Sequence, residues 1–260
     1  MSEKWLICPA ARASPSRSAP RLRLYCFPYS GGNAAAFVPW QREIDPAIEL
    51  CAVQLPGRGA RFREPPCTSF KALIRTLGDV LQAQQSRAPL PFAFYGHSLG
   101  ALIAFELARH CRRHGLPMPA HLIVSGCNAP PLKEKSKRLH ELPDDQLIEK
   151  LRDYNGTPRE ILDNRELMQL LLPTVRADFA LGADYRYEDE SPLPIPLTAL
   201  SGRQDRHVHD DEGGESGLCG WRRQTSAAYR EQWFEGGHFF INESRRQVLD
   251  CLAGALLDAA

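Results

Sequence analysis

The chain lacks long hydrophobic runs and has no excess of charge of either sign. Its 260 residues include 32 basic and 31 acidic side chains, for a formal net charge of +1. Such a balance creates no overall field that would favour nucleic acid or an anionic membrane. No segment approaches the roughly 20 apolar residues of a membrane span, and Trp5–Cys8 is much shorter than a signal-peptide core. We therefore expect no nucleic-acid or membrane partner and no secretion.

Paired cysteine motifs are also missing. The eight cysteines are scattered singly, without a C-x-x-C pair and without histidines at zinc-type spacing. Several of them, such as Cys26, Cys51 and Cys127, lie in or beside apolar runs, where a free thiol behaves as a small core side chain. We expect reduced thiols, a cytoplasmic location and no bound metal.

The pattern along the chain predicts an α/β fold with a mostly parallel central sheet and helices on both faces. Residues 1–21 form a lead-in, rich in Ala, Ser, Pro and Arg from residue 9, which we expect to be flexible. From Leu22 onward, β-type runs alternate with helical patterns, as in βαβ units. The expected strands cover 22–27, 49–54, 91–95, 121–125, 197–201 and 232–234, and the expected helices cover 34–44, 69–85, 99–114, 221–229 and 243–257.

A helical block interrupts this alternation between the core segments 22–128 and 188–260. Within residues 129–187, helical patterns cover 144–154, 165–172 and 174–181. The block is either a lid over a site or a helical embellishment at the sheet edge, and helix spacing does not separate these alternatives.

The segment Gly96–Gly100 is the most informative feature of the chain. It reads Gly-His-Ser-Leu-Gly and joins an apolar run to a helical pattern, which is the setting of a G-x-S-x-G nucleophile elbow. The flanking strand and helix make this interpretation more specific than the short pattern alone, which also occurs by chance. We predict Ser98 as a nucleophile.

A serine nucleophile needs a base and an orienting acid, here in the chain order Ser, Asp or Glu, His. His238 follows two glycines after the last expected strand, and Asp205 follows the strand at 197–201. Asp210 and Asp211 are rivals for the acid in the same loop, and Asp205 can also be a turn residue. We predict Ser98, Asp205 and His238 as the catalytic set.

An oxyanion formed at Ser98 needs fixed N–H donors. The Leu99 amide, at the start of a helix, is one candidate, and the Ser30 amide in the loop Phe27–Asn33 is the second. A plain Gly-Gly turn explains that loop equally well.

With these segments in view, the chain resembles the type II thioesterases, which are stand-alone editing α/β-hydrolases of nonribosomal peptide and polyketide assembly lines. The resemblance implies a substrate in which an acyl or aminoacyl group is carried as a thioester on the phosphopantetheine arm of a carrier protein. It also implies a monomer, a lid at 129–187, no cofactor beyond the substrate's own phosphopantetheine, and a setting such as siderophore synthesis. The segment 211–218 departs from the family as an insertion. The matching segments are Phe27–Gly32, Gln54–Arg58, Tyr95–Ala101, Leu172–Phe179 and Gly236–Phe240.

Acidic carrier proteins would dock on basic side chains. The candidates are Arg58, Arg61, Arg63, Lys133, Lys135, Lys137 and Arg138, against the alternatives of solvated surface charge or, for Arg58, a structural ion pair.

Three other functions stay open at this point. The same catalytic set would serve a carboxylesterase or lipase acting on small esters. A hydrolase scaffold without chemistry would be an interaction module. Gly213–Ser216 faintly resembles a phosphopantetheine attachment site, although a loop is the simpler interpretation.

Overall fold

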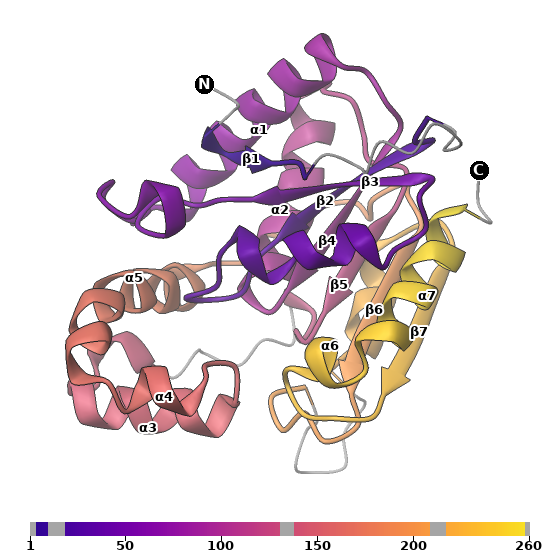
Figure 1. Cartoon of the computed structure of the whole chain (residues 1–260). Helices are drawn as coiled ribbons and strands as arrows, with labels where there is room; N and C mark the ends of the chain where they lie inside the picture. Colours follow the sequence, from indigo (N-terminus) through magenta and orange to yellow (C-terminus); the bar gives the residue numbers. More distant parts are fainter. Residues whose placement is uncertain (1–3, 10–18, 131–137, 209–216, 258–260) are drawn as a thin grey trace.

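A seven-stranded sheet forms the centre of the protein. The computed structural model describes residues 4–9, 19–130, 138–208 and 217–257. The strand order is β1-β3-β2-β4-β5-β6-β7, and the strands are parallel from β3 through β7, as the alternating pattern predicts (Figure 1). The strands are β1 (Leu6–Ile7), β2 (Leu22–Phe27), β3 (Ile48–Val53), β4 (Phe92–His97), β5 (Leu122–Ser125), β6 (Leu197–Gly202) and β7 (Tyr229–Phe234).

Two helical layers cover the two faces of this sheet (Figure 1). One layer holds α1 (Phe70–Arg87) and α2 (Leu99–His114), and the other holds η2 (Ala34–Ala36), η3 (Val38–Arg42), α6 (Phe240–Glu243) and α7 (Arg245–Leu257). Local sequence explains the ends of the first layer. The Ser69 side chain caps α1 by accepting from the Ala72 amide, and Gly115 ends α2 in the left-handed conformation.

The chain between β5 and β6 leaves the sheet and folds into α3 (Asp144–Tyr154), α4 (Arg159–Leu162) and α5 (Arg165–Asp184). We call these three helices the insertion. The insertion has its own apolar cluster, which includes Leu147, Leu162 and Met168. We predicted separate helices over 165–172 and 174–181, but α5 continues through Pro173. Proline removes one backbone hydrogen bond, and burial of Leu172, Thr174 and Val175 on both sides of it offsets that loss.

The N-terminal expectation is wrong for the described residues before Leu22. β1 pairs antiparallel with β3, so that the sheet starts at Leu6, and Trp5 is buried beneath the guanidinium of Arg61. Cys8 and Cys51 form a disulfide that ties this edge to β3, whereas we expected all cysteines to be reduced. The other six cysteines are outside any disulfide.

Two predicted helices are also wrong. Residues 34–42 form the short 3-10 helices η2 and η3 in place of one long helix, because Pro39 lacks the amide hydrogen that a continuous helix would use. The expected helix at 221–229 is a 3-10 helix, η7 (Cys219–Gln224), followed by β7. Thr225 separates them, since its hydroxyl donates to the backbone oxygen of Ile195 at 2.6 Å.

His121 begins the segment that leads into β5 and is almost fully buried. Its Nε2 lies 2.8 Å from the Thr198 hydroxyl, and its Nδ1 has no partner among the described residues. Burial, followed by the nearby charge of Arg230, lowers the pKa of His121 to about 4. The folded protein therefore keeps this imidazole neutral at a pH where the unfolded chain binds a proton.

Acid should destabilise the protein through His121. Stability from the neutral imidazole is fully present above pH ~6.5 and is lost as the pH falls towards 4, which costs about 3 kcal/mol. His121→Gln, which can retain the bond to Thr198, should remove most of that loss. Urea unfolding at pH 7 and pH 4 measures it, and equal losses in the two proteins would contradict the assignment.

Candidate functional site

Ser98 lies on a strained turn between β4 and α2, as the elbow pattern predicts. Its backbone has φ 55° and ψ −116°, which a non-glycine residue rarely adopts. The turn is possible because its neighbours are small: a Cβ on Gly96 would lie 2.0 Å from the Gly100 carbonyl oxygen, and a Cβ on Gly100 would lie 2.1 Å from that of Phe27. The turn therefore holds Ser98 at the carboxyl end of the sheet.

Asp205 and His238 meet at the same end of the sheet. His238 Nδ1 lies 2.9 Å from Asp205 Oδ2, and the second carboxylate oxygen accepts the His207 amide at 2.9 Å. Gly202 lets the two loops approach, since a Cβ there would lie 2.3 Å from the carbonyl oxygens of Gly236 and Gly237. The two predicted partners of Ser98 are therefore brought together. The rival acids Asp210 and Asp211 lie outside the described residues.

The surroundings keep the carboxylate of Asp205 charged. Burial alone would raise its pKa, but the hydrogen bond and charge of His238, with the His207 amide, outweigh burial and lower the pKa. The ring of His97 packs against that of His238, with ring centroids 5.1 Å apart, and His97 Nδ1 lies 2.9 Å from the Ser125 hydroxyl. Burial, followed by the charge of His238, lowers the pKa of His97 well below its ordinary value. The His97 imidazole is therefore uncharged.

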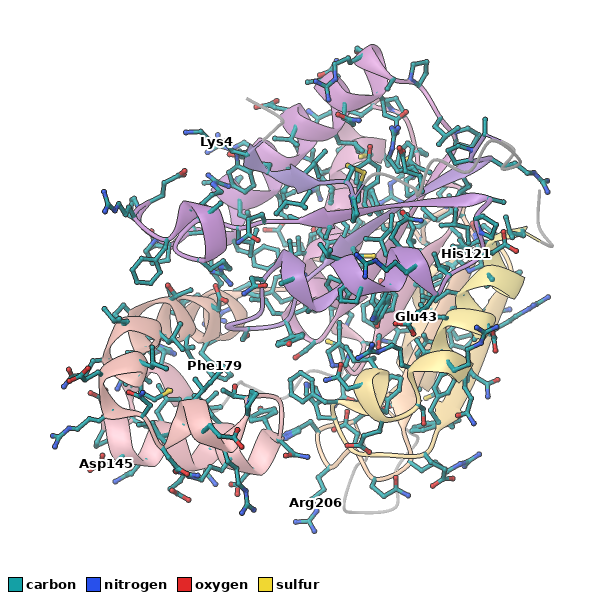
Figure 2. All side chains as sticks on the ribbon, viewed as in Figure 1. Lys4, Glu43, His121, Asp145, Phe179 and Arg206 are labelled. Carbon is teal, nitrogen blue, oxygen red and sulfur yellow. A yellow bond between two sulfur atoms is a disulfide. The ribbon has the colours of Figure 1, made fainter. Side chains whose placement is uncertain are left out.

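A cavity of about 370 Å³ opens beside Ser98 and His238. This volume is in the range of small-molecule sites. The insertion contributes to its lining, with Met168 and Phe179 among the lining side chains. Figure 2 labels Phe179 on the insertion. The ring of Tyr154, also from the insertion, stacks on that of His207 with centroids 4.1 Å apart. It contacts the His238 ring edge-on, with centroids 5.3 Å apart. The site thus joins a polar catalytic corner to an apolar chamber.

The two predicted oxyanion donors lie in segments that border the cavity. Leu99 is the first residue of α2, directly after Ser98, and Ser30 lies in a tight turn that lines the cavity. In that turn the Gly32 amide donates to the Tyr29 oxygen at 2.8 Å. The neighbouring Gly31 amide already donates to Asp178 Oδ2 at 2.7 Å, which leaves Ser30 as our candidate in this loop.

The predicted basic docking residues do not form one exposed surface. Arg58 and Arg61 are buried, and Arg58 forms an ion pair with Asp178, so that its structural alternative holds. Arg138 is exposed and paired with Glu141 at 2.7 Å. The described residues do not include Lys133, Lys135 or Lys137. The same holds for Gly213–Ser216.

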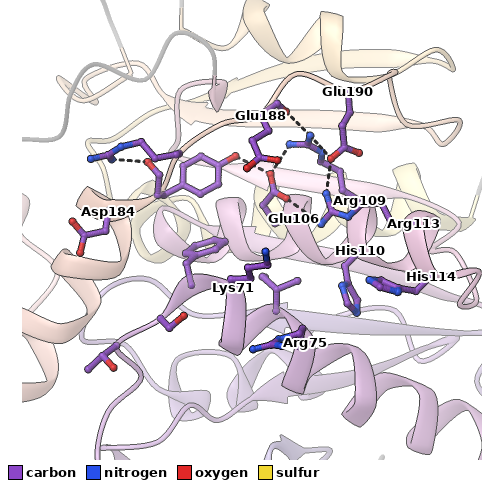
Figure 3. Close-up of a pocket in the computed structure, with 16 residues that line it drawn as sticks. Lys71, Arg75, Glu106, Arg109, His110, Arg113, His114, Asp184, Glu188 and Glu190 are labelled. Atoms are coloured by element: carbon purple, nitrogen blue, oxygen red, sulfur yellow. Dashed lines mark hydrogen bonds and ion pairs between the residues drawn. The ribbon is translucent and has the colours of Figure 1, made fainter.

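A second cavity, of about 750 Å³, lies between α1, α2 and residues 184–190 (Figure 3). Several of its charged side chains pair with one another: Arg109 donates to Glu106 at 2.6 Å and forms an ion pair with Glu190 at 2.6 Å. The Tyr185 hydroxyl also donates to Glu106, at 2.9 Å. Helices rather than strand ends line this cavity, and we interpret its charges as a structural network.

Comparison with known proteins establishes the family of this chain. The family model described as "Thioesterase domain" matches residues 22–256. This chain belongs to the thioesterase domain family. The gramicidin S biosynthesis protein GrsT of Aneurinibacillus migulanus is 40% identical over 239 residues, which are 92% of this chain and 90% of GrsT.

Solved structures agree with this assignment. RedJ, a thioesterase from the prodiginine pathway of Streptomyces coelicolor, has a TM-score of 0.83 and 36% identity, covering 92% of this chain and 87% of RedJ. YbtT, a type II thioesterase from the yersiniabactin pathway, has a TM-score of 0.83 and 31% identity, covering 98% of this chain and 99% of YbtT. The predicted α/β-hydrolase fold, the resemblance to type II thioesterases and the assignment as a hydrolase are confirmed.

The described part of this thioesterase contains no helix that is long and apolar enough to cross a bilayer. Within the same residues, no group of three or more His, Cys, Asp or Glu side chains is placed to hold a metal ion.

Sequence reasoning missed three residues at the site. The contact between Gly202 and the histidine loop, and that between Tyr154 and His207, depend on how distant loops pack, which no local pattern encodes. Asp178 lies in a segment that matched the family, Leu172–Phe179, but only the structure places its carboxylate against the loop of Ser30.

Replacement of the elbow glycine should be severe. Gly100→Ala forces a methyl group into the Phe27 carbonyl, and we expect a loss of at least about 3 kcal/mol with loss of activity. Gly115→Ala is the control, because that glycine has a positive φ but no neighbour within 4 Å, so that only about 1 kcal/mol should be lost. Thermal unfolding compares them. Equal effects would show that the Phe27 carbonyl does not exclude a methyl group at position 100.

Proposed function

We propose that this thioesterase hydrolyses acyl or aminoacyl thioesters on the phosphopantetheine arm of carrier proteins, and so clears stalled or mis-primed groups from a nonribosomal peptide or polyketide assembly line. The observation that carries the proposal is the strained elbow serine, Ser98, in one cavity with a histidine that is hydrogen-bonded to a buried aspartate. The relatives GrsT and YbtT support the assembly-line setting.

In the proposed acylation step, His238 takes the Ser98 proton as the serine oxygen attacks the thioester carbonyl. Asp205, bonded to Nδ1 of His238, fixes the tautomer that leaves Nε2 as the base and stabilises the imidazolium that forms. The amides of Leu99 and Ser30 stabilise the negative charge on the carbonyl oxygen. The C–S bond then breaks, and the imidazolium of His238 returns its proton to the departing pantetheine sulfur, so that His238 is a free base again. The pantetheine thiol leaves readily because a thiol pKa is about 8.5.

Deacylation reuses the same groups. Water, deprotonated by His238, attacks the acyl ester of Ser98, and the serine leaves with the returned proton. The acyl group occupies the apolar cavity between the core and the insertion, which is lined by Met168 and Phe179. The insertion acts as the lid over this cavity. This sequence of steps is complete without a metal or redox cofactor, and phosphopantetheine takes part only as the substrate's arm.

The proposed partner is therefore a carrier domain. We propose that the enzyme binds it as a monomer and acts in the cytoplasm. The Cys8–Cys51 disulfide is the observation that opposes this location, because reducing compartments disfavour such bonds. Of the proposed docking residues, Arg63 and Arg138 are exposed, and Arg138 lies shortly before the insertion.

Removal of the nucleophile tests the mechanism. Ser98→Ala should lower kcat for an acyl-carrier thioester at least about 10³-fold and abolish labelling by a fluorophosphonate probe, because no acyl-enzyme can form. Mass spectrometry of a loaded carrier follows the loss of the acyl group. Ser191→Ala, an exposed serine outside the cavity, is the control and should match the wild type. Undiminished deacylation by Ser98→Ala would refute the mechanism.

Substrate choice separates the carrier-directed enzyme from a general esterase. We expect kcat/KM for an acyl-loaded carrier to exceed that for a p-nitrophenyl ester of the same acyl group by at least about tenfold, because the carrier supplies additional binding energy. Steady-state kinetics on the two substrates measure the ratio. A ratio below one would favour the carboxylesterase alternative.

A further inference from the structure

A buried ion pair joins the insertion to the loop that carries the proposed oxyanion donor. Asp178, on α5, is fully buried, and its two oxygens accept from Arg58 Nη1 and Nη2 at 2.5 and 2.8 Å. The same carboxylate accepts the Gly31 amide at 2.7 Å, and Arg58 Nη1 donates to the Gly32 oxygen at 3.1 Å. The pair therefore holds two neighbouring backbone groups of one loop.

Those two groups belong to a tight turn. Tyr29 and Gly32 close the turn by a hydrogen bond of 2.8 Å, and Gly31 has φ +74°, which is typical of a type II turn. Types I and II differ in which way the central peptide faces. Here the N–H of that peptide, from Gly31, points at Asp178, so that the carboxylate selects one orientation. The preceding peptide carries the Ser30 N–H.

The contact extends over a full turn of α5. The Thr174 hydroxyl donates to the Gly57 oxygen at 2.8 Å, next to Arg58, and a Cβ on Gly31 would lie 3.0 Å from Val175. Side chains at positions 174, 175 and 178 share one face of the helix. This face packs against the loops of Gly31 and Gly57, which line the same cavity as Ser98.

We propose that Asp178 and Arg58 are positioning residues that hold the Ser30 amide where the oxyanion forms. The proposal rests on the proposed thioester hydrolysis by Ser98. The proposal implies that the second half of α5, although it belongs to the insertion, helps to position the oxyanion donor of the site. Oxyanion donors stabilise a transition state only if they are fixed beforehand, and a two-pronged arginine–carboxylate pair is a rigid way to fix them.

Asp178→Asn tests the proposal with little change in volume. We expect kcat for the acyl-carrier thioester to fall at least tenfold while KM stays within twofold, because the defect is specific to the transition state. A trifluoromethyl ketone analogue, whose adduct with Ser98 carries an oxyanion, should bind at least tenfold more weakly. A thioether analogue, which cannot react, should bind within twofold. Arg58→Lys keeps the positive charge but cannot donate two parallel hydrogen bonds to the carboxylate, and it should show the same selective loss of kcat and of ketone affinity.

The second buried arginine network provides the matched control. Glu106→Gln breaks a pairing with Arg109 away from the strand ends (Figure 3), so that it should lower the melting temperature and leave kcat and both affinities unchanged. If Asp178→Asn behaves like this control, the pair is only structural and the proposal is overturned. If Asp178→Asn does not fold, Arg58→Gln with Asp178→Asn removes both charges, and the same two outcomes decide.

The two proposals fail in different ways. A wild-type protein that does not hydrolyse thioesters, or a fully active Ser98→Ala, refutes the function. An active wild type and an inactive Ser98→Ala, together with normal kcat and ketone affinity in Asp178→Asn, refute the positioning role alone.

Discussion

The close approach of three backbone segments at Gly100 is the constraint on which the site depends. Here the first turn of α2 lies directly on the end of β2, with room for hydrogen but not for a methyl group beside the Phe27 carbonyl. The contact that turns Ser98 outward also brings the Leu99 amide near the loop of Ser30, because that loop begins where β2 ends. The positions of the predicted nucleophile and of the two predicted oxyanion donors therefore depend on the same backbone packing.

The parallel sheet supplies the remaining geometry. Loops that follow parallel strands emerge at one edge, so Ser98 after β4, Asp205 after β6 and His238 after β7 converge although they are distant in sequence. Burial at this edge costs free energy for any charge, and the loops compensate by pairing. Asp205 keeps its charge through His238 and the His207 amide, whereas His97 is held neutral.

Local patterns predicted what local physics determines. The elbow, α1 and α2 have caps, glycines and apolar spacing within a few residues, and all three lie where the sequence indicated. β1 has two residues, too few for an alternating pattern, and its pairing with β3 depends on distant chain. The Cys8–Cys51 bond has the same origin, because its partners are 43 residues apart and neither lies in a paired motif.

The candidate site divides in the same way. Ser98 and His238 could be named from the residues beside them, but the link between Arg58 and Asp178 spans 120 residues and appears only when α5 packs on the core. The local sequence Pro56-Gly57-Arg58 alone does not distinguish a buried arginine from one on the surface. The burial of Arg58 explains why a residue that we considered for carrier docking faces inward.

The insertion consequently has two unequal attachments to the core. The second half of α5 is held by a buried ion pair, and breaking such a pair costs about 3–5 kcal/mol. α3 meets the core at the ring contact between Tyr154 and His207, and aromatic pairs contribute about 1 kcal/mol. Separation of the insertion from the core therefore costs less free energy at the Tyr154 contact of α3 than at the ion pair of α5.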